Sequence, residues 1–308
     1  MLIGNHFWIT GQAINSETVS LIYPSKLLLF GEYTVLSGSQ ALAVPLKQWK
    51  GEWKQTDDGF AGSSSPLMKY VDWLKSKDII SSATAAHIIN DAEEGWNYVA
   101  DIPIGYGLGS SGAYVAAIYD RYIIKEDSTT AFTTLEMLSK MEGYFHGSSS
   151  GMDPMVSYTG EAVYKNEMGS FQSVRDPGWP ERFQVYLLDS GIGRATGPLV
   201  ELYKDALKQS SFQLLVKREL IPMVEHAIHF YLNESGQMLD ECIQVISQFQ
   251  RLHFSKLIPT PVQKQWDALV KIPGVYLKFC GAGGGGYFLV ISCRNEILPE
   301  MDELIKIS

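Results

Sequence analysis

The chain has 308 residues, 45% of them hydrophobic, and a formal net charge of −9. This length exceeds what one hydrophobic core usually serves, so two domains are expected. The acidic balance argues against a nucleic-acid partner, because binding a phosphate backbone needs a basic surface. The three cysteines lack CxxC spacing, and the sequence shows neither a basic leader before an apolar core nor an apolar run of membrane-spanning length. We therefore expect a soluble cytoplasmic protein without a membrane partner.

Residues 20–44 show the short apolar runs that are typical of β-strands. The predicted strands cover residues 21–23, 27–30 and 33–36. A break at Gly31-Glu32 and a Ser-Gly-Ser turn at 37–39 interrupt these runs. Lys26 stands among apolar neighbours, so its ammonium group either extends to solvent, the commoner outcome, or is partly buried beside an anion.

Helix and strand signals alternate along the rest of the chain. Helical periodicity covers residues 67–90, 113–123, 131–145 and, with interruptions at 235–236 and 259–261, the stretch from 198 to 270. Further strands are predicted around Trp53, before a surface loop ending at Pro66, and over 183–188, 275–279 and 287–291. A Pro- and Gly-containing stretch at 177–180 indicates a boundary, which divides the chain into residues 1–180 and 181–308. The mixture in each half predicts an α+β fold.

The most informative motif runs from Pro103 to Ala113 and reads P-I-G-Y-G-L-G-S-S-G-A, directly before a predicted helix. Glycine at 107 and 109 permits positive φ and lets a ligand approach the backbone. Ser110 and Ser111 fall where the helix begins, and the first N–H groups of a helix lack intrahelical acceptors. Such a loop binds anions, and phosphate is the first ligand to consider. A glycine-rich turn with a serine N-cap is the alternative, of equal weight for an isolated motif.

Two carboxylates, Glu142 and Asp153, stand at the ends of a Ser- and Gly-rich stretch. Glu142 falls near the end of a predicted helix, and the stretch can fold Asp153 back toward it. One carboxylate would then bind Mg²⁺ while the other faces a substrate hydroxyl. The plainer alternative makes Glu142 a solvated helix residue, Asp153 a turn cap and His146 a helix-end residue.

A glycine run, Gly281 to Gly286, lies between two apolar strands near the end of the chain. Such a run either connects a hairpin or forms a second surface where backbone approaches a ligand closely. Its four consecutive glycines exceed what an ordinary turn requires, which favours the ligand.

Taken together, these segments resemble the GHMP kinases, the superfamily of galactose, homoserine, mevalonate and phosphomevalonate kinases. Residues 24–36 are similar to its lysine-containing strand ending in Gly-Glu, 103–113 to its PxxxGLGSSAA phosphate loop, and 278–286 to its C-terminal glycine motif. Residues 142–153 resemble the mevalonate-kinase pattern around HGxPSGxD, with the glutamate at the same separation. The resemblance implies a ribosomal-protein-S5-type N-terminal domain, a ferredoxin-like C-terminal domain, a site between them, and leaves a homodimer open.

The resemblance also implies an ATP- and Mg²⁺-dependent kinase of a small metabolite, with mevalonate as the leading acceptor. Asp153 would accept or orient the proton of the attacking hydroxyl, Lys26 would pair with Asp153, and Ser111 and Glu142 would ligate Mg²⁺. The residues implied to hold the nucleotide are Gly107, Leu108, Gly109, Ser110, Ser111, Gly112, Gly283 and Gly284. The residues implied to contact the acceptor are Glu32, Ser150, Gly151, Arg194, Thr196, Gly281 and Ala282.

Three departures from the family patterns bear on the acceptor. Tyr33 replaces the histidine of Gly-Glu-His in mevalonate kinases, a form that looks more like phosphomevalonate kinases. Ser149 replaces the proline of HGxPSGxD, and Gly112 stands where many relatives have alanine. One alternative is a phosphomevalonate kinase, for which a second basic cluster would be expected. The other is a sugar or amino-alcohol kinase. A GHMP-like binding protein without catalysis is the least favoured interpretation, because Lys26 and both carboxylates are present. For Arg194 and Thr196, a simple strand-end loop is an equal alternative.

Overall fold

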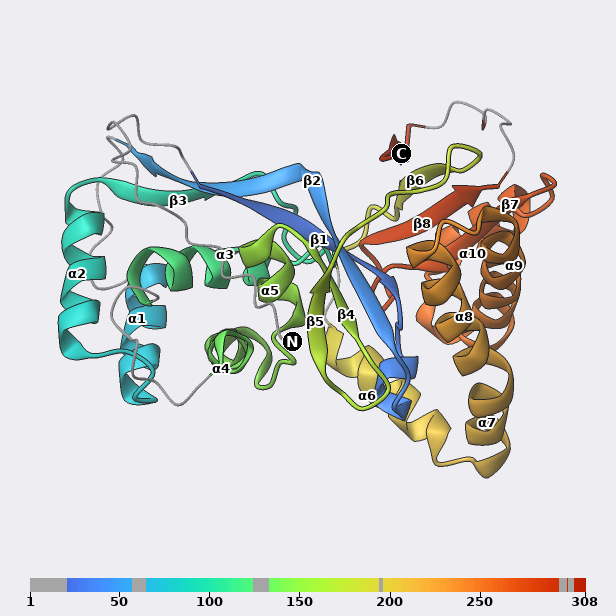
Figure 1. Ribbon diagram of the computed structural model, residues 1–308, viewed down its shortest axis with the longest axis horizontal. Coiled ribbons are helices and arrows are strands. Elements are labelled where there is room, and N and C mark those ends of the chain that lie inside the picture. The colour runs from blue at the N-terminus through green and yellow to red at the C-terminus, as the bar shows by residue number, and fades with distance from the viewer. Residues whose placement is uncertain (1–20, 57–64, 124–132, 194–195, 294–297, 299–301) are drawn as a thin grey trace, which may run out of the picture.

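The described strands form two antiparallel sheets, one in each half of the chain (Figure 1). A computed structural model describes residues 21–56, 65–123, 133–193, 196–293, 298 and 302–308. In the five-stranded sheet the order is β1-β2-β4-β5, and β3 pairs with another part of β2. Its strands are β1 Ile22–Phe30, β2 Ala41–Gln55, β3 Trp96–Ala100, β4 Ala162–Lys165 and β5 Phe171–Val174. The four-stranded sheet, in the order β7-β8-β6-β9, comprises β6 Gln184–Asp189, β7 Val275–Phe279, β8 Tyr287–Ser292 and β9 Leu304–Lys306.

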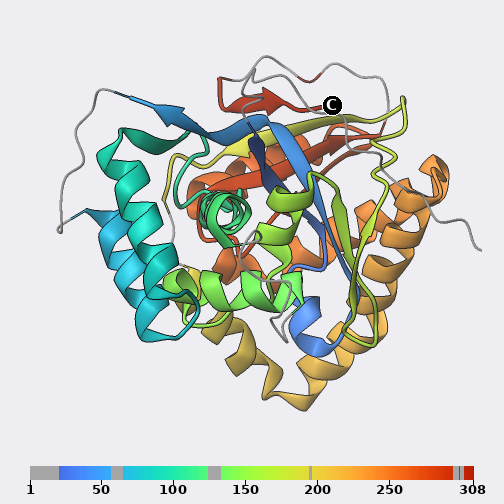
Figure 2. The ribbon, with the colours of Figure 1, turned by 60° about the vertical axis from the view of Figure 1, so that its left-hand side comes forward.

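Helices pack on both sheets (Figures 1 and 2). In the first half they are α1 Pro66–Ser76, α2 Ser82–Glu93, α3 Ser110–Ile118, α4 Thr134–His146 and α5 Met152–Thr159. In the second half they are α6 Thr196–Leu207, α7 Ser210–Leu215, α8 Ile221–Leu232, α9 Gly236–His253 and α10 Thr260–Leu269. Short 3-10 helices cover Thr34–Ser37 and Ser255–Leu257, and π-helical turns cover Tyr119–Ile123 and Val216–Leu220. Helices α3 and α5 contact β1 and β2, whereas α9 and α10 contact β7.

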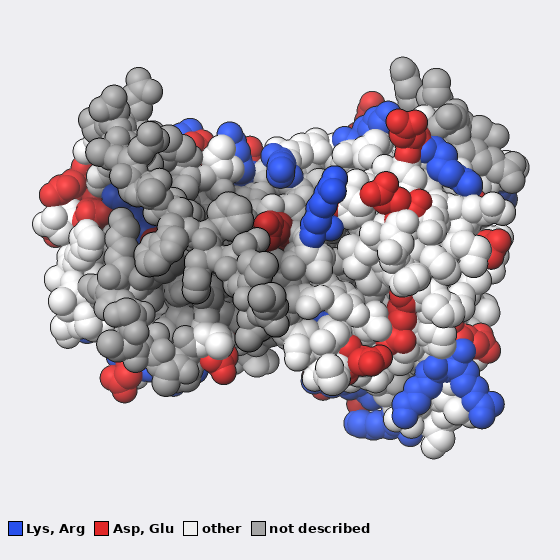
Figure 3. All heavy atoms as spheres, in the orientation of Figure 1, with Lys and Arg blue, Asp and Glu red and all other residues white. Residues whose placement is uncertain are grey.

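Most of the buried hydrophobic residues of both halves form one cluster. A second, smaller cluster comprises Ala41, Ala43, Met152, Val156 and Val163. In α9, for example, the buried apolar residues recur every three or four positions, the period of one helix face. They are Leu239, Cys242, Ile243, Ile246 and Phe249. The surface has two lobes that correspond to the two sheets, and acidic and basic side chains are interspersed over the described part of the face in Figure 3.

The α+β fold in two domains is confirmed, because each half of the chain builds its own sheet with its own helices. The strands of the first sheet end at Val174 and those of the second begin at Gln184. The division at residue 180 stays a prediction, which this order of elements supports. Within the described part of the chain, no helix combines the length and apolar character that crossing a membrane requires.

Several predicted elements differ from the structure. The strand expected over 33–36 is a 3-10 helix, because Gly31 and Tyr33 take φ angles of 109° and 64° and turn the chain into the β1-β2 hairpin. The helical stretch 67–90 is two helices, each begun by a serine N-cap, Ser65 or Ser81. Sequence patterns did not indicate β3, β4, β5 or β9, whose strands have three to five residues.

Candidate active site

The loop before α3 is shaped by left-handed glycines. Gly105, Gly107 and Gly109 have φ angles of 79°, 83° and 74°, which L side chains rarely adopt. Gly109 is itself the N-cap of α3, and no side chain caps the helix. The N–H groups of the first turn therefore keep their capacity to bind an anion. The serine N-cap interpretation is wrong, because the cap is a glycine.

Lys26 is buried against this loop. Its side chain is 7% exposed, and Nζ lies 2.8 Å from Oδ2 of Asp153. Its backbone N–H donates to the carbonyl of Leu108 at 2.9 Å. A Cβ atom on Gly109 would lie 2.7 Å from Cγ of Lys26, so only glycine leaves room for the lysine stem. The expectation that the ammonium group extends to solvent is wrong, and the alternative of burial beside an anion is confirmed. Leu108 as a whole is only 1% exposed, and its contact with the nucleotide stays a prediction.

Asp153 lies in the first turn of α5, opposite the start of α3. The N-cap of α5 is Gly151, again a left-handed glycine, with φ 77°. The side chain of Asp153 is 33% exposed, so one side remains accessible while Lys26 holds the other. Gly112 allows α3 to approach, because a Cβ atom there would lie 2.9 Å from the backbone C of Asp153. Gly112 thus packs against α5, and its predicted contact with the nucleotide could only involve its backbone.

Glu142 is a buried residue of α4, only 3% exposed. The hydroxyl of Ser111 lies 3.4 Å from Oε1, and the hydroxyl of Ser149 donates to Oε2. Burial and the charge of Asp153 raise the pKa of Glu142 to about 7, although Ser149 and Lys26 act in the opposite direction. The interpretation of Glu142 as a solvated helix residue is therefore wrong.

His146 contacts Ser111, one of the two serines beside Glu142. It is the last residue of α4, as a helix-end residue should be, and Nε2 lies 3.0 Å from Oγ of Ser111. The Ser111 hydroxyl therefore stands between an imidazole and a carboxylate.

The donor set of Ser111 and Glu142 suits the predicted Mg²⁺ site. One hydroxyl and one carboxylate are the oxygen donors that Mg²⁺ takes from a protein when phosphates and waters complete its octahedron. The described residues hold no group of three or more His, Cys, Asp or Glu side chains suited to a metal. The residues thus fit a metal that arrives with a nucleotide, provided that Glu142 loses its proton.

The C-terminal glycine run is the turn of the β7-β8 hairpin. The Gly284 N–H donates to the carbonyl of Leu257 at 2.6 Å, and a Cβ atom on Gly283 would lie 2.6 Å from that same oxygen. Gly286 has φ 66°, and a Cβ there would lie 2.6 Å from the carbonyl oxygen of Tyr106, in the first glycine loop. The hairpin interpretation is confirmed, and the protein's own backbone explains these glycines. Contacts of Gly283 and Gly284 with ATP stay a prediction.

Glu32 does not lie open to a ligand. Its carboxylate is buried and accepts a hydrogen bond from Nζ of Lys278 in β7. The neighbouring Tyr33 is also buried, and its hydroxyl donates to the carbonyl of Ala282. The structure thus joins the first motif to the third at this point.

Four of the remaining predicted acceptor residues lie in two turns. Ser150 and Gly151 form the turn before α5, where the Ser150 hydroxyl accepts from the N–H of Met152 at 3.3 Å. Gly281, next to Ala282, belongs to the β7-β8 turn. Thr196 is the first residue of α6. Arg194 lies outside the described residues.

Comparison with known proteins matches the family described as GHMP kinases N terminal domain to residues 81–161. A mevalonate kinase of Thermococcus sibiricus is 30% identical over 49% of this chain, so the match spans only about half, 52%, of that relative. A mevalonate kinase of Archaeoglobus fulgidus is 24% identical over 85% of this chain and 88% of its own length. The segment that matches the GHMP kinase family, residues 81–161, contains the first glycine loop, Ser111, Glu142 and Asp153.

Solved structures share this GHMP kinase fold. Streptococcus pneumoniae phosphomevalonate kinase, in complex with phosphomevalonate and AMPPNP, has a TM-score of 0.61 at 15% identity, covering 89% of this chain and 92% of that one. L. major mevalonate kinase, in complex with R-mevalonate, has a TM-score of 0.58 at 17% identity, covering 90% and 88%. These similar scores show the fold and do not separate the acceptors.

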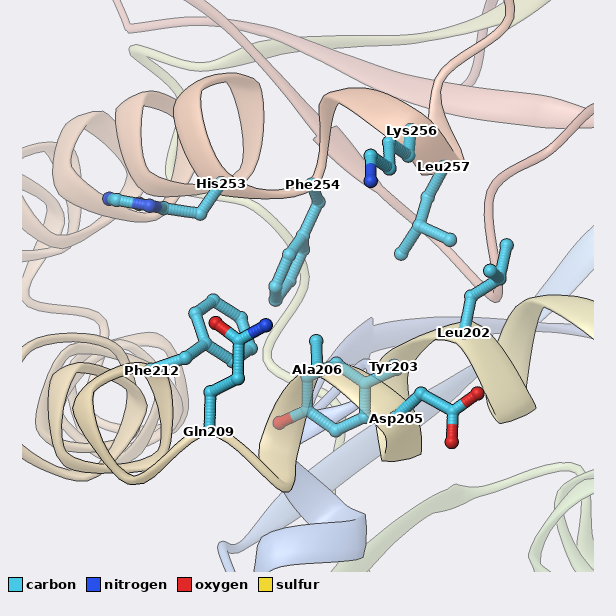
Figure 4. A pocket seen from close by; sticks show the side chains of 10 residues that line it. All are labelled: Leu202, Tyr203, Asp205, Ala206, Gln209, Phe212, His253, Phe254, Lys256 and Leu257. Carbon is cyan, nitrogen blue, oxygen red and sulfur yellow. The ribbon is translucent and has the colours of Figure 1, made fainter.

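Beside Tyr33, the protein has an aromatic-lined cavity of about 260 Å³ between α6, α7 and the end of α9 (Figure 4). Tyr203 and Phe254 line it, and both rings also contact Tyr33. Its lining includes none of the predicted site residues. The sequence patterns assigned no role to Ser149, Lys278 or Tyr33. Ser149 and Tyr33 were noted only as departures from the family motifs, and Lys278 only as the first residue of the third motif.

Proposed function

We propose that this protein is a GHMP kinase that transfers the γ-phosphoryl group of ATP to a hydroxyl of a small metabolite, with mevalonate as the first acceptor to test. The observation that carries the proposal is the buried contact of Lys26 with Asp153, beside the uncapped start of α3. A binding protein has no need of a positioned carboxylate beside an anion loop. The curated relatives named mevalonate kinase support the choice of acceptor.

In this proposal each residue has one task. The loop 105–109 and the first turn of α3 hold the phosphates through backbone N–H groups. Asp153 receives or orients the proton of the acceptor hydroxyl, and Lys26 keeps that carboxylate in place and offsets the charge on the transferring phosphoryl group. Positioning and electrostatics supply most of the rate in such transfers.

Mg²⁺, held by Ser111 and Glu142, would supply charge neutralisation at the phosphate oxygens. The Ser111 hydroxyl already faces Glu142, so these donors need little rearrangement. Glu142 must be ionised for this task, which its raised pKa makes sensitive to pH. We place the reaction in the cytoplasm and propose that the enzyme works alone or as a homodimer.

A phosphomevalonate kinase is the second candidate. Tyr33 favours it, because the form Gly-Glu-Tyr looks more like those enzymes than Gly-Glu-His does. In this structure, however, the Tyr33 side chain is buried in contacts with the protein itself, which removes it from the acceptor.

A coupled ADP-release assay with ATP and Mg²⁺ tests the proposal over mevalonate, phosphomevalonate, galactose and homoserine. The D153N protein, purified in the same way, measures contaminating kinases. Mevalonate-dependent ADP release by the native chain alone, with the phosphorylated product seen by mass spectrometry, is the expected result. Turnover of phosphomevalonate alone would move the assignment to the second candidate, and no turnover of any acceptor would reject a kinase.

A further inference from the structure

A buried ion pair joins the two halves of the chain, and neither of its members is among the residues proposed to bind phosphate. Glu32 follows β1, and Lys278 lies in β7; their side chains are 2% and 0% exposed. Nζ of Lys278 donates to the Glu32 carboxylate and to the carbonyl of Phe279. It also lies 5.4 Å from the ring centroid of Phe30. The charges are thus removed from water: the Lys278 ammonium group donates to Glu32 and to one carbonyl, and the Glu32 carboxylate accepts from Lys278 and from a backbone N–H.

The next residue makes a second link between the same segments. Tyr33 donates its hydroxyl to the carbonyl of Ala282, inside the glycine hairpin. Its ring centroid lies 4.8 Å from that of Tyr203 and 5.6 Å from that of Phe254. Tyr33 adopts φ 64°, a strained conformation for a bulky residue that persists only where surrounding contacts hold it. These contacts therefore determine where residues 32–33 lie relative to the hairpin.

A buried ion pair contributes specificity more than stability. Apolar residues of the same shape often serve a core equally well, whereas loss of one partner leaves an unpaired buried charge at a large cost. Lys278 precedes the glycine hairpin by only three positions, and Glu32 follows Lys26 by six on the same strand and its turn. The pair thus connects the segment that carries Lys26 to the segment that carries the hairpin.

We infer that Glu32, Tyr33, Lys278 and Ala282 form a latch that positions the glycine hairpin against the strand carrying Lys26. Glu32 and Lys278 are then positioning residues, and Glu32 does not bind the acceptor. The inference rests on the proposed function for its kinetic consequence only. The structural consequence, a hairpin held in one place by the ion pair, does not depend on any activity.

A double-mutant cycle with Lys278→Met, Glu32→Gln and the pair of changes tests the latch in the full chain. Kinetics are measured at a temperature where circular dichroism shows each variant folded, and amide exchange of residues 280–287 is followed by mass spectrometry. Lys278→Met should lower kcat/KM by at least roughly tenfold and speed hairpin exchange by about tenfold, because the hairpin loses its anchor. The double variant should recover part of the kcat/KM and part of the protection of the hairpin from exchange, because it leaves no unpaired buried charge.

Two further proteins sharpen the outcome. Lys204→Met removes an exposed ion pair with Glu201 and should leave both readouts unchanged. Tyr33→Phe removes only one hydroxyl and should speed hairpin exchange even where the Lys278 variants fail to fold. The latch would be overturned if the two single changes acted independently on kcat/KM in the double variant, if Glu32→Gln raised the KM for the acceptor, and if hairpin exchange stayed native. Glu32 would then be an acceptor ligand. If the native chain shows no kinase turnover, the proposed function fails, and exchange alone decides the latch.

Discussion

Gly112 in α3 and Asp153 in α5 are packed so closely that a single methyl group would not fit between them. A Cβ atom on Gly112 would lie 2.9 Å from the backbone C of Asp153 and 3.1 Å from its Cβ. The approach is backbone to backbone, so no flexible side chain can yield. The position of the proposed base thus depends on the absence of a side chain one helix away.

Replacing Gly112 with alanine should move the start of α5 and lower kcat by about tenfold or more, because small misplacement of a catalytic group is costly. It should also destabilise the fold by about 1–3 kcal/mol through overpacking. The matched control is Gly143→Ala in α4, where a Cβ would meet only the Trp73 ring at 3.9 Å. That change should leave kcat unaltered and raise stability by up to about 1 kcal/mol. Native kcat in the Gly112 variant would refute the packing argument.

Asp153→Asn should keep ATP binding nearly intact and reduce kcat by about two to four orders of magnitude, as loss of a positioned acid-base group does. Nucleotide affinity is measured by isothermal titration and kcat by ADP release. Lys26→Met should reduce kcat as well, since it leaves the Asp153 carboxylate without its partner at 2.8 Å. Near-native kcat in Asp153→Asn would remove this residue from its proposed role.

The raised pKa of Glu142 makes both stability and metal binding depend on pH. The group has a pKa of about 7 in the folded protein against the ordinary 4.5. Its folded-state pKa is raised, so its contribution to stability is full below 4.5 and is lost as pH rises through 7. Mg²⁺ needs the ionised form, so the half-saturating Mg²⁺ concentration should be about tenfold higher at about pH 6 than at about pH 8. In Glu142→Gln, the remaining pH dependence of Mg²⁺ binding should come only from titration of the nucleotide.

Ser149→Ala removes the hydroxyl that donates to Oε2 of Glu142 and accepts from the Gly151 N–H at 2.9 Å. Because Ser149 lowers the pKa of Glu142, its loss should raise that pKa further and shift the Mg²⁺ dependence to higher pH. Thermal unfolding should show a loss of about 1–2 kcal/mol from these partly buried hydrogen bonds. Ser76→Ala, which deletes an exposed hydroxyl bonded to the carbonyl of Trp73, should change neither property. An unshifted pH profile of Mg²⁺ dependence in Ser149→Ala would show that Ser149 does not influence the pKa of Glu142.

Periodicity and glycine placement predict much of this structure, because they reflect local backbone physics. The start of α3 at Ser110, the hairpin strands around the second glycine run and the helices from 196 to 269 follow from such patterns. The strands β3, β4, β5 and β9 do not, since their three to five residues are stabilised by pairing with distant strands rather than by their own pattern.

The burial of charged groups was the least predictable part of the site. From composition, Lys26 belongs in solvent and Glu142 on a helix surface. Lys26 is buried because Asp153, distant in sequence, satisfies it, and Glu142 because Ser149, seven positions away, donates to it across the turn that follows α4. Family resemblance supplied the pairing of Lys26 with Asp153. Neither residue pattern nor resemblance indicated that Lys278 would take the Glu32 carboxylate, because that contact appears only when the two sheets meet.

The contact between Glu32 and Lys278 spans 246 positions of the chain. During synthesis, the first half therefore emerges with a carboxylate whose partner does not yet exist, directly after a strand that belongs to the core shared by both halves. The first 180 residues alone would leave that group and the surrounding apolar surface exposed to chaperones and to other chains. Folding to the native state is thus completed only after the β7-β8 hairpin has left the ribosome.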